Sequence, residues 1–149
     1  MLVPDLAYPR AFTLRVGRTD QSYVDLDDPL RLEFDYVQRL VDVLDTVAEP
    51  GKRLRVVHVG GAGMTLPRYI AATRPSSAQI VLEPDVELTA FVRRHLPLPT
   101  RSGIKVRGVD GRSSVTVETF AWASYQPRIE RLVTRCRVDR ERPASLGVG

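Results

Sequence analysis

The residue types that could do chemistry in this chain are a cluster of glycines and two carboxylates, each placed after an apolar run. The glycines are Gly60, Gly61 and Gly63, and the carboxylates are Glu83 and Asp110. Glycines let the backbone turn sharply and let a ligand approach it, and the N-terminus of a following helix offers N–H groups. Glu83 is placed to accept hydrogen bonds from both hydroxyls of a ribose, and Asp110 from an adenine amino group. The glycine-to-acid spacing of about 20 residues is that of nucleoside-binding folds, so these residues predict an adenosine pocket.

The same residues also fit a protein that binds no nucleoside. Tight turns use glycine whether or not a ligand binds, Glu83 can simply begin the next helix, and Asp110 can cap a turn. His58 lies inside the apolar run before the glycines, and we expect a core histidine satisfied by a hydrogen bond. The single cysteine, Cys136, excludes an intrachain disulfide and has no metal-ligand spacing to a histidine, so no metal site is expected.

The elements that must position these residues alternate between strand-like and helix-like patterns. Apolar runs at residues 54–59, 80–83 and 104–109 are typical of buried parallel strands, and helical patterns follow the first two. Thr65 is expected to cap the first of these helices through its hydroxyl, and residues 86–96 form the second. This alternation predicts an α/β fold with a parallel sheet.

The N-terminal part has the pattern of a small β-hairpin followed by a long helix. Two short extended patterns flank turn residues 17–20, which predicts a hairpin within an N-terminal segment of residues 1–29. The sequence DDP at residues 27–29 is expected to open the helix, which carries an apolar stripe at helical spacing. Residues 30–112 then form the nucleoside-binding core.

Beyond Arg112 the patterns weaken. One strand is predicted at residues 115–119 and one amphipathic helix at residues 127–138, and nothing else there resembles a buried strand. We therefore expect residues 113–149 to be a divergent basic C-terminal tail and the parallel sheet to be incomplete. The abrupt switch is what a frameshift or a truncation of a longer reading frame would leave.

Composition limits the class of protein. Of 149 residues, 43% are apolar and 27% are charged, which fits one soluble globular core. No apolar run is long enough to span a membrane and the N-terminus lacks signal-peptide features, so a cytoplasmic protein is expected. Much of the net charge of +4 comes from arginines in the tail. Because no nucleic-acid motif or aromatic stacking platform accompanies them, a solvated tail is favoured over a nucleic-acid partner.

Four stretches together resemble the spermidine synthase (aminopropyltransferase) family, particularly its actinobacterial spermidine synthase-like branch. They are QSYVDLDDPLRLEFDY, VVHVGGAGMTLPRY, VLEPD and VRGVDGR, within residues 12–112. The resemblance implies a Rossmann-like methyltransferase fold with a small β-rich segment at the N-terminus. It also implies transfer of an aminopropyl group from decarboxylated S-adenosylmethionine to putrescine, with release of methylthioadenosine.

The resemblance also assigns residues to the site. Gln21 matches the glutamine that follows the first hairpin turn, and Tyr36 matches the tyrosine of the EF-x-Y helix. Glu83 matches the ribose-binding acid, and Asp110 the acid at the adenine. With Gly60, Gly61 and Gly63, these residues are expected to bind the co-substrate, either decarboxylated S-adenosylmethionine or S-adenosylmethionine, next to a polyamine acceptor. The alternative interpretations are a polar turn residue for Gln21 and a helix-surface aromatic for Tyr36.

Two departures from the family pattern bear on activity. The family's loop reads GGGDG, where the carboxylate helps to hold the cationic donor, but here the equivalent place falls at Ala62 or Gly63. The family's general base lies in a D-x-x-D-P segment after a fourth strand, and the only aspartate after Asp110 is Asp139, which sits among arginines. Because an amine nucleophile needs a positioned base, we expect poor aminopropyl transfer and assign no catalytic residue.

The sequence leaves three functions open. The first is a spermidine synthase-like transferase of polyamine biosynthesis. The second is a catalytically inactive, degenerate member that acts as a binding or interaction module and pairs with itself or another subunit through an exposed sheet edge. The third is an S-adenosylmethionine-dependent methyltransferase, in which the ligand's carboxylate would meet the glycine-loop N–H groups. The absent loop acid is the feature that favours this third function.

Overall fold

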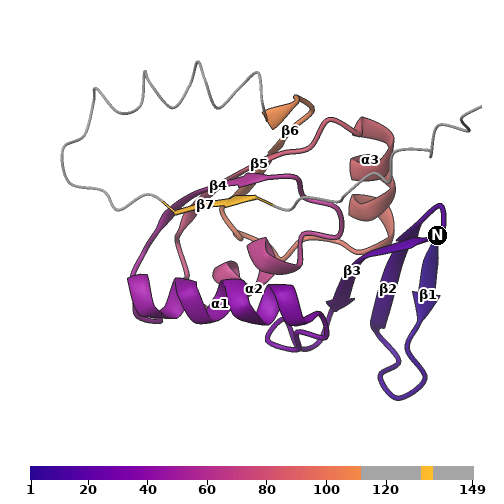
Figure 1. Cartoon of the computed structure of the whole chain (residues 1–149), viewed down its shortest axis with the longest axis horizontal. Helices are drawn as coiled ribbons and strands as arrows, with labels where there is room; N and C mark the ends of the chain where they lie inside the picture. The colour runs from indigo at the N-terminus through magenta and orange to yellow at the C-terminus, as the bar shows by residue number, and fades with distance from the viewer. Residues whose placement is uncertain (112–131, 136–149) are drawn as a thin grey trace, which may run out of the picture.

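The computed structural model describes residues 1–111 and 132–135, which form two sheets flanked by helices (Figure 1). The strands are β1 (Leu2–Pro4), β2 (Ala11–Val16), β3 (Thr19–Asp25), β4 (Arg55–Val59), β5 (Ala78–Leu82), β6 (Ile104–Arg107) and β7 (Leu132–Arg135), and the helices are α1 (Asp35–Val47), α2 (Thr65–Thr73) and α3 (Val86–His95). The first sheet is antiparallel with order β1-β2-β3, and the second is parallel with order β6-β5-β4-β7. Among the described residues, no helix has the length and apolar character needed to cross a membrane.

The second sheet confirms the predicted α/β class. β4 and β5 pair in register from Arg55 opposite Ala78 to Val59 opposite Leu82, and β5 pairs with β6 in the same direction. Parallel neighbours need a crossover connection, which α2 and α3 supply. Because β5 ends at Leu82, Glu83 follows the strand directly instead of closing it.

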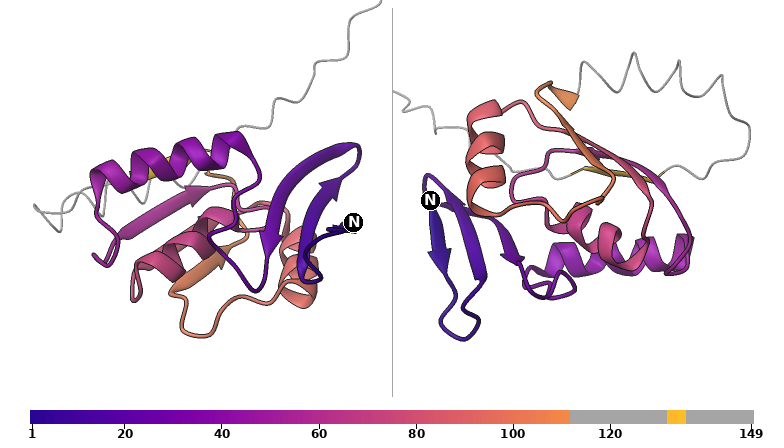
Figure 2. Two further views of the ribbon diagram at one scale, coloured as in Figure 1. Left: turned by 90° about the horizontal axis from the view of Figure 1, so that it is seen from below. Right: turned by 180° about the vertical axis from the view of Figure 1, so that it is seen from behind.

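Helices α1 and α2 lie side by side on one face of the parallel sheet (Figures 1 and 2). Val41 and Leu44 of α1 pack with Val56 of β4 and Ile70 of α2 in one buried cluster. The helical period places these residues on the inner side of each helix. Burial of each large side chain contributes about 1.5–3 kcal/mol, so this cluster fixes both helices against β4.

The start of α1 differs from the prediction. Residues 27–29 were expected to open the helix, but α1 begins at Asp35. The carboxylate of Asp25 instead accepts hydrogen bonds from the N–H groups of Asp27 (2.9 Å) and Asp28 (3.0 Å). An aspartate that satisfies the backbone two and three residues ahead stabilises a turn in place of a helix.

The predicted hairpin is confirmed as β2 and β3, and β1, which the sequence did not indicate, adds a third strand to it. This sheet packs on α3 through a cluster that contains Leu14 of β2, Val24 of β3, and Val92 and Leu96. Figure 1 shows the N-terminal sheet next to α3, at one end of the parallel sheet. The packing brings β3 to the loop that follows β4.

β7 overturns the predicted helix at residues 127–138. It pairs in parallel with β4, starting with Val56 opposite Leu132. The sequence LVT suits a strand, and the edge of β4 offers backbone N–H and C=O groups that need partners. This edge of β4 is therefore occupied and not available for the self-pairing considered above. The predicted strand at residues 115–119 and the rest of the predicted tail lie outside the described residues.

Gly103 and Gly17 give a matched test of a close backbone approach. Both have a positive φ, +71° and +60°, a conformation that costs an alanine about 1–2 kcal/mol. A Cβ on Gly103 would also lie 2.0 Å from the carbonyl oxygen of Ser77, whereas one on Gly17 would meet no atom within 4 Å. In urea denaturation we expect Gly103→Ala to lower the free energy of unfolding by at least about 3 kcal/mol and Gly17→Ala by about 1 kcal/mol. Equal losses would show that the Ser77 contact is not restrictive.

Candidate functional site

The loop between β4 and α2 satisfies its own backbone N–H groups. The acceptors of its five consecutive N–H groups are the carbonyl of Leu82 for Gly60, the carboxylate of Glu83 for Gly61 and Ala62, the hydroxyl of Ser22 for Gly63, and the carbonyl of Gly61 for Met64. A ligand that needs N–H donors from this loop would therefore have to break a hydrogen bond already made. The arrangement disfavours the expected contact between these N–H groups and a ligand's carboxylate.

Glu83 lies at the centre of these hydrogen bonds. Its Oε2 accepts from the N–H groups of Gly61 (2.9 Å) and Ala62 (3.1 Å), and its Oε1 accepts from the N–H of Asp85 (3.1 Å). Because only 8% of Glu83 is exposed, these donors replace most of the water around its carboxylate. A hydrogen bond to a charged group contributes about 1.5–3 kcal/mol. Glu83 therefore holds the glycine loop against the end of β5.

Two of the loop glycines are required by close contacts. A Cβ on Gly61 would lie 2.6 Å from Cγ1 of Val81, and one on Gly63 would lie 2.7 Å from the Cβ of Ser22. Between them, Ala62 has a φ of 41°, which a non-glycine residue adopts only when its surroundings hold it there. The hydrogen bonds on either side supply that restraint.

The N-terminal sheet reaches the loop through β3. The hydroxyl of Ser22, which is 5% exposed, accepts from the N–H of Gly63 (3.0 Å), and the hydroxyl of Thr65 donates to the carbonyl of Tyr23 (2.6 Å). The predicted capping role of Thr65 is wrong, because α2 has Met64 as its N-cap and no side-chain cap. Sequence reasoning missed Ser22 because this contact joins residues 41 positions apart, and no local pattern signals it.

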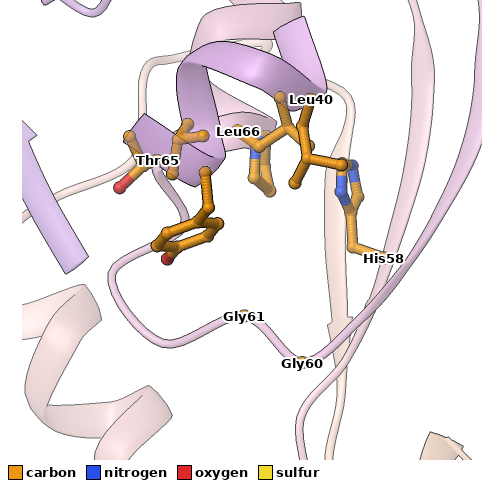
Figure 3. Close-up of a pocket in the computed structure, with 9 residues that line it drawn as sticks. Leu40, His58, Gly60, Gly61, Thr65 and Leu66 are labelled. Carbon is orange, nitrogen blue, oxygen red and sulfur yellow. The ribbon is translucent and has the colours of Figure 1, made fainter. Parts of the chain in front are cut away.

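A small pocket lies between α1, α2 and the start of the loop (Figure 3). Its lining residues are Tyr36, Val37, Leu40, His58, Gly60, Gly61, Thr65, Leu66 and Pro67. Figure 3 shows His58 and the apolar side chains across from the loop backbone at Gly60 and Gly61. The hydroxyl of Tyr36 donates to the backbone carbonyl of Gln21 (3.4 Å), so Gln21 contacts Tyr36, which lines the pocket together with Gly60 and Gly61. A volume of about 30 Å³ holds roughly one or two waters, so a nucleoside would bind outside it, along the strand ends.

Asp110 lies near the carboxyl end of β4. The neighbouring Gly111 is buried there, since a Cβ on it would lie 2.4 Å from Cγ1 of Val59, whereas Asp110 itself is exposed. The predicted residues thus divide into three groups: the loop glycines Gly60, Gly61 and Gly63 with Glu83, which accepts from Gly61; the pair Gln21 and Tyr36; and the exposed Asp110. Within residues 1–111 and 132–135, no three His, Cys, Asp or Glu side chains are grouped as metal ligands would be.

Behind the pocket, His58 and Gln79 form a buried polar pair. Nε2 of His58 lies 2.9 Å from Oε1 of Gln79, and the amide nitrogen of Gln79 donates to the carbonyl of Pro67 (3.0 Å). Because the amide nitrogen is used in this way, the oxygen of Gln79 faces His58 and Nε2 of the imidazole carries the hydrogen. Burial lowers the pKa of His58 to about 4, so its ring is neutral at physiological pH. The expected core histidine is confirmed.

Arg68 fixes the carbonyl side of the loop. It is 3% exposed, and its guanidinium donates to the carbonyls of Gly63 (3.2 Å), Pro97 (3.0 Å) and Leu96 (2.5 Å). Burial lowers the pKa of Arg68 to about 10, which leaves it charged at neutral pH. No local sequence pattern indicates this role, because the three acceptors are backbone groups.

Comparison with known proteins identifies a related fold. No family model matches the chain, and no curated protein matches it. A solved structure that is similar is the crystal structure of a probable spermidine synthase from Corynebacterium glutamicum ATCC 13032, with a TM-score of 0.69 and 26% sequence identity. The match covers 78% of this chain and 43% of that one, so this chain spans less than half the length of that protein. The fold is spermidine synthase-like, with the predicted Rossmann-like parallel sheet.

Burial of His58 makes stability depend on pH in a defined direction. Its pKa is about 4 in the folded protein against an ordinary 6.5, so between these values the unfolded chain binds a proton that the folded protein does not. We expect the unfolding equilibrium constant to rise by up to about tenfold per unit as pH falls through this window, measured by urea denaturation.

The chain has two histidines, which makes the assignment testable. His58→Gln should flatten the pH dependence, and His95→Gln, at an exposed position, is the matched control. The same slope in both variants would assign the effect to other groups.

Proposed function

We propose that this chain binds the nucleoside part of an S-adenosylmethionine-type molecule at the carboxyl ends of β4, β5 and β6. The observation that carries the proposal is the Glu83 carboxylate at the end of β5, held 2.9 Å from the N–H of Gly61 in the glycine loop. In open parallel sheets, ligands bind outside these strand ends. The similarity to a probable spermidine synthase makes this class of nucleoside the first candidate.

The surface around Glu83 suits an adenosine. Within the part of the chain that the structure describes, Oε1 accepts one backbone N–H, which leaves an acceptor position for one ribose hydroxyl. Val86 and Val109 are 61% and 38% exposed, and a Cβ on Gly108 would lie 2.8 Å from Cγ2 of Val86, so the two valines belong to adjoining segments. Exposed apolar side chains at this place can contact a purine face, and Asp110 is the proposed acceptor for the adenine amino group.

The glycine loop is expected to distinguish nucleosides by whether the chain attached to their sulfur carries a carboxylate. A carboxylate tail needs N–H donors, and those from Gly60 to Met64 already have protein acceptors. Decarboxylated S-adenosylmethionine and methylthioadenosine have no such requirement, so we place them ahead of S-adenosylmethionine as ligands. The methyltransferase alternative is correspondingly less favoured. Gln21 and Tyr36 are the proposed neighbours of the tail and of a polyamine acceptor.

Aminopropyl transfer is proposed as the ancestral reaction of this site. Ala62 and Gly63 stand where the family's loop acid is expected, so the loop supplies no carboxylate for the donor's amine. This observation favours a second candidate, a binding module that keeps the nucleoside site and catalyses nothing. Ligand binding is common to both candidates and is the property to test first.

Calorimetric titration with methylthioadenosine, decarboxylated S-adenosylmethionine and S-adenosylmethionine measures that property. We expect the first two to bind at least as tightly as the third. Glu83→Gln should weaken methylthioadenosine binding by about tenfold or more, because the amide has one acceptor oxygen and no charge. Glu87→Gln, at an exposed acid in the first turn of α3, is the matched control and should bind like the unchanged protein.

The outcomes separate the candidates. If no nucleoside binds to a protein whose circular dichroism shows it folded, the proposed function is wrong. If S-adenosylmethionine binds more than tenfold tighter than methylthioadenosine, the methyltransferase class becomes the better candidate.

A further inference from the structure

The Glu83 carboxylate has almost no free acceptor capacity. An ionised carboxylate offers about four lone-pair positions, two on each oxygen. Oε2 uses both positions on the N–H groups of Gly61 and Ala62, and Oε1 uses one on the N–H of Asp85. With respect to residues 1–111 and 132–135, one acceptor position, on Oε1, is left.

A vicinal diol presents two hydroxyl donors at once. A single hydroxyl can be accepted at the vacant position of Oε1 without disturbing the loop. The second hydroxyl has to take a position on Oε2 that a loop N–H occupies. A diol can therefore bind Glu83 through both hydroxyls only if Gly61 or Ala62 gives up its hydrogen bond.

We infer that binding of a ribose diol to Glu83 opens one of the two hydrogen bonds by which Gly61 and Ala62 hold the glycine loop to this carboxylate. We call this pair of hydrogen bonds the latch. The second ribose hydroxyl inserts between Oε2 and a loop N–H, donating to the carboxylate and accepting from the amide, as a hydroxyl can do both. The inference rests on the proposed nucleoside site and specifies how that site responds to its ligand. The longer of the two bonds, from Ala62 at 3.1 Å, is the one expected to open.

The anchors on either side confine this movement to Gly61 and Ala62. Gly60 is tied to β5 through the carbonyl of Leu82 (2.9 Å). Gly63 is tied on both sides, by its N–H to Ser22 (3.0 Å) and by its carbonyl to Arg68 (3.2 Å). The loop can therefore open next to Glu83 while its attachments to β3, β5 and α2 persist.

Opening the latch reduces the binding affinity that the second hydroxyl adds. Hydrogen bonds to a charged group account for roughly ten- to hundredfold in an equilibrium constant. If the loop bond must open, this gain is offset, and methylthioadenosine should bind less than about tenfold tighter than its 2′-deoxy analogue. A carboxylate free to accept both hydroxyls would give the full ten- to hundredfold difference.

Nuclear magnetic resonance of the full chain tests the latch directly. Trans-hydrogen-bond scalar couplings report the bonds from the amide nitrogens of Gly61 and Ala62 to the carboxyl carbon of Glu83. We expect both couplings in the free protein and in the complex with 2′-deoxy-methylthioadenosine, and the loss of at least one on saturation with methylthioadenosine. The Gly63 amide, bonded to Ser22, is the internal reference and should keep its resonance position in both complexes.

Failure of the latch and failure of the nucleoside site give different results. Both couplings persisting in the saturated methylthioadenosine complex would overturn the latch and leave the nucleoside site intact. Absence of binding by the folded protein would overturn the nucleoside site, and the latch with it.

Discussion

The structure depends on one buried carboxylate and the N–H groups that it binds. Glu83 is almost fully enclosed, and a buried charge is tolerated only when hydrogen bonds replace the water that it has lost. The loop N–H groups need acceptors for the same reason. Each side therefore satisfies the other, and the sharp turn after β4 follows from this exchange. The glycines make the turn sterically feasible, and Glu83 gives the turn its particular shape.

This loop is also where separate parts of the chain meet. Ser22 and Tyr23 attach it to the N-terminal sheet, and Arg68 attaches it to the segment that follows α3. Each of these contacts joins one side chain, that of Ser22, Thr65 or Arg68, to a backbone group of a distant segment. A displacement of β3 or of α3 would consequently be transmitted to the N–H groups beside Glu83. The small N-terminal sheet is thus a structural component of the candidate site.

Local sequence patterns predicted the strands and helices that can be recognised from the composition and periodicity of neighbouring residues. The three apolar runs gave β4, β5 and β6, and the alternation with helices gave the parallel order, because a buried parallel strand has a distinctive composition. The predictions failed where the local structure or contact depends on a partner that is distant in the sequence. Ser22 acts across 41 positions, and the segment at Leu132 has a pattern that suits a helix or a strand until the edge of β4 is present to pair with it. Asp25 displaced the start of α1 by a side-chain hydrogen bond that competes with helix formation.

The position of β7 shows that pairing of the sheet and supply of a catalytic carboxylate are separate requirements. A fourth strand next to β4 completes the pairing that the backbone of β4 needs, and residues of suitable strand propensity meet that need. Aminopropyl transfer at the same edge would also need a carboxylate base directly after the fourth strand. The D-x-x-D-P segment supplies this base in the family that the sequence resembles. In this chain the strand ends at Arg135, and Cys136 and Arg137 follow in the sequence. A strand can therefore complete the pairing of β4 without carrying any of the carboxylates that a polyamine acceptor site would require.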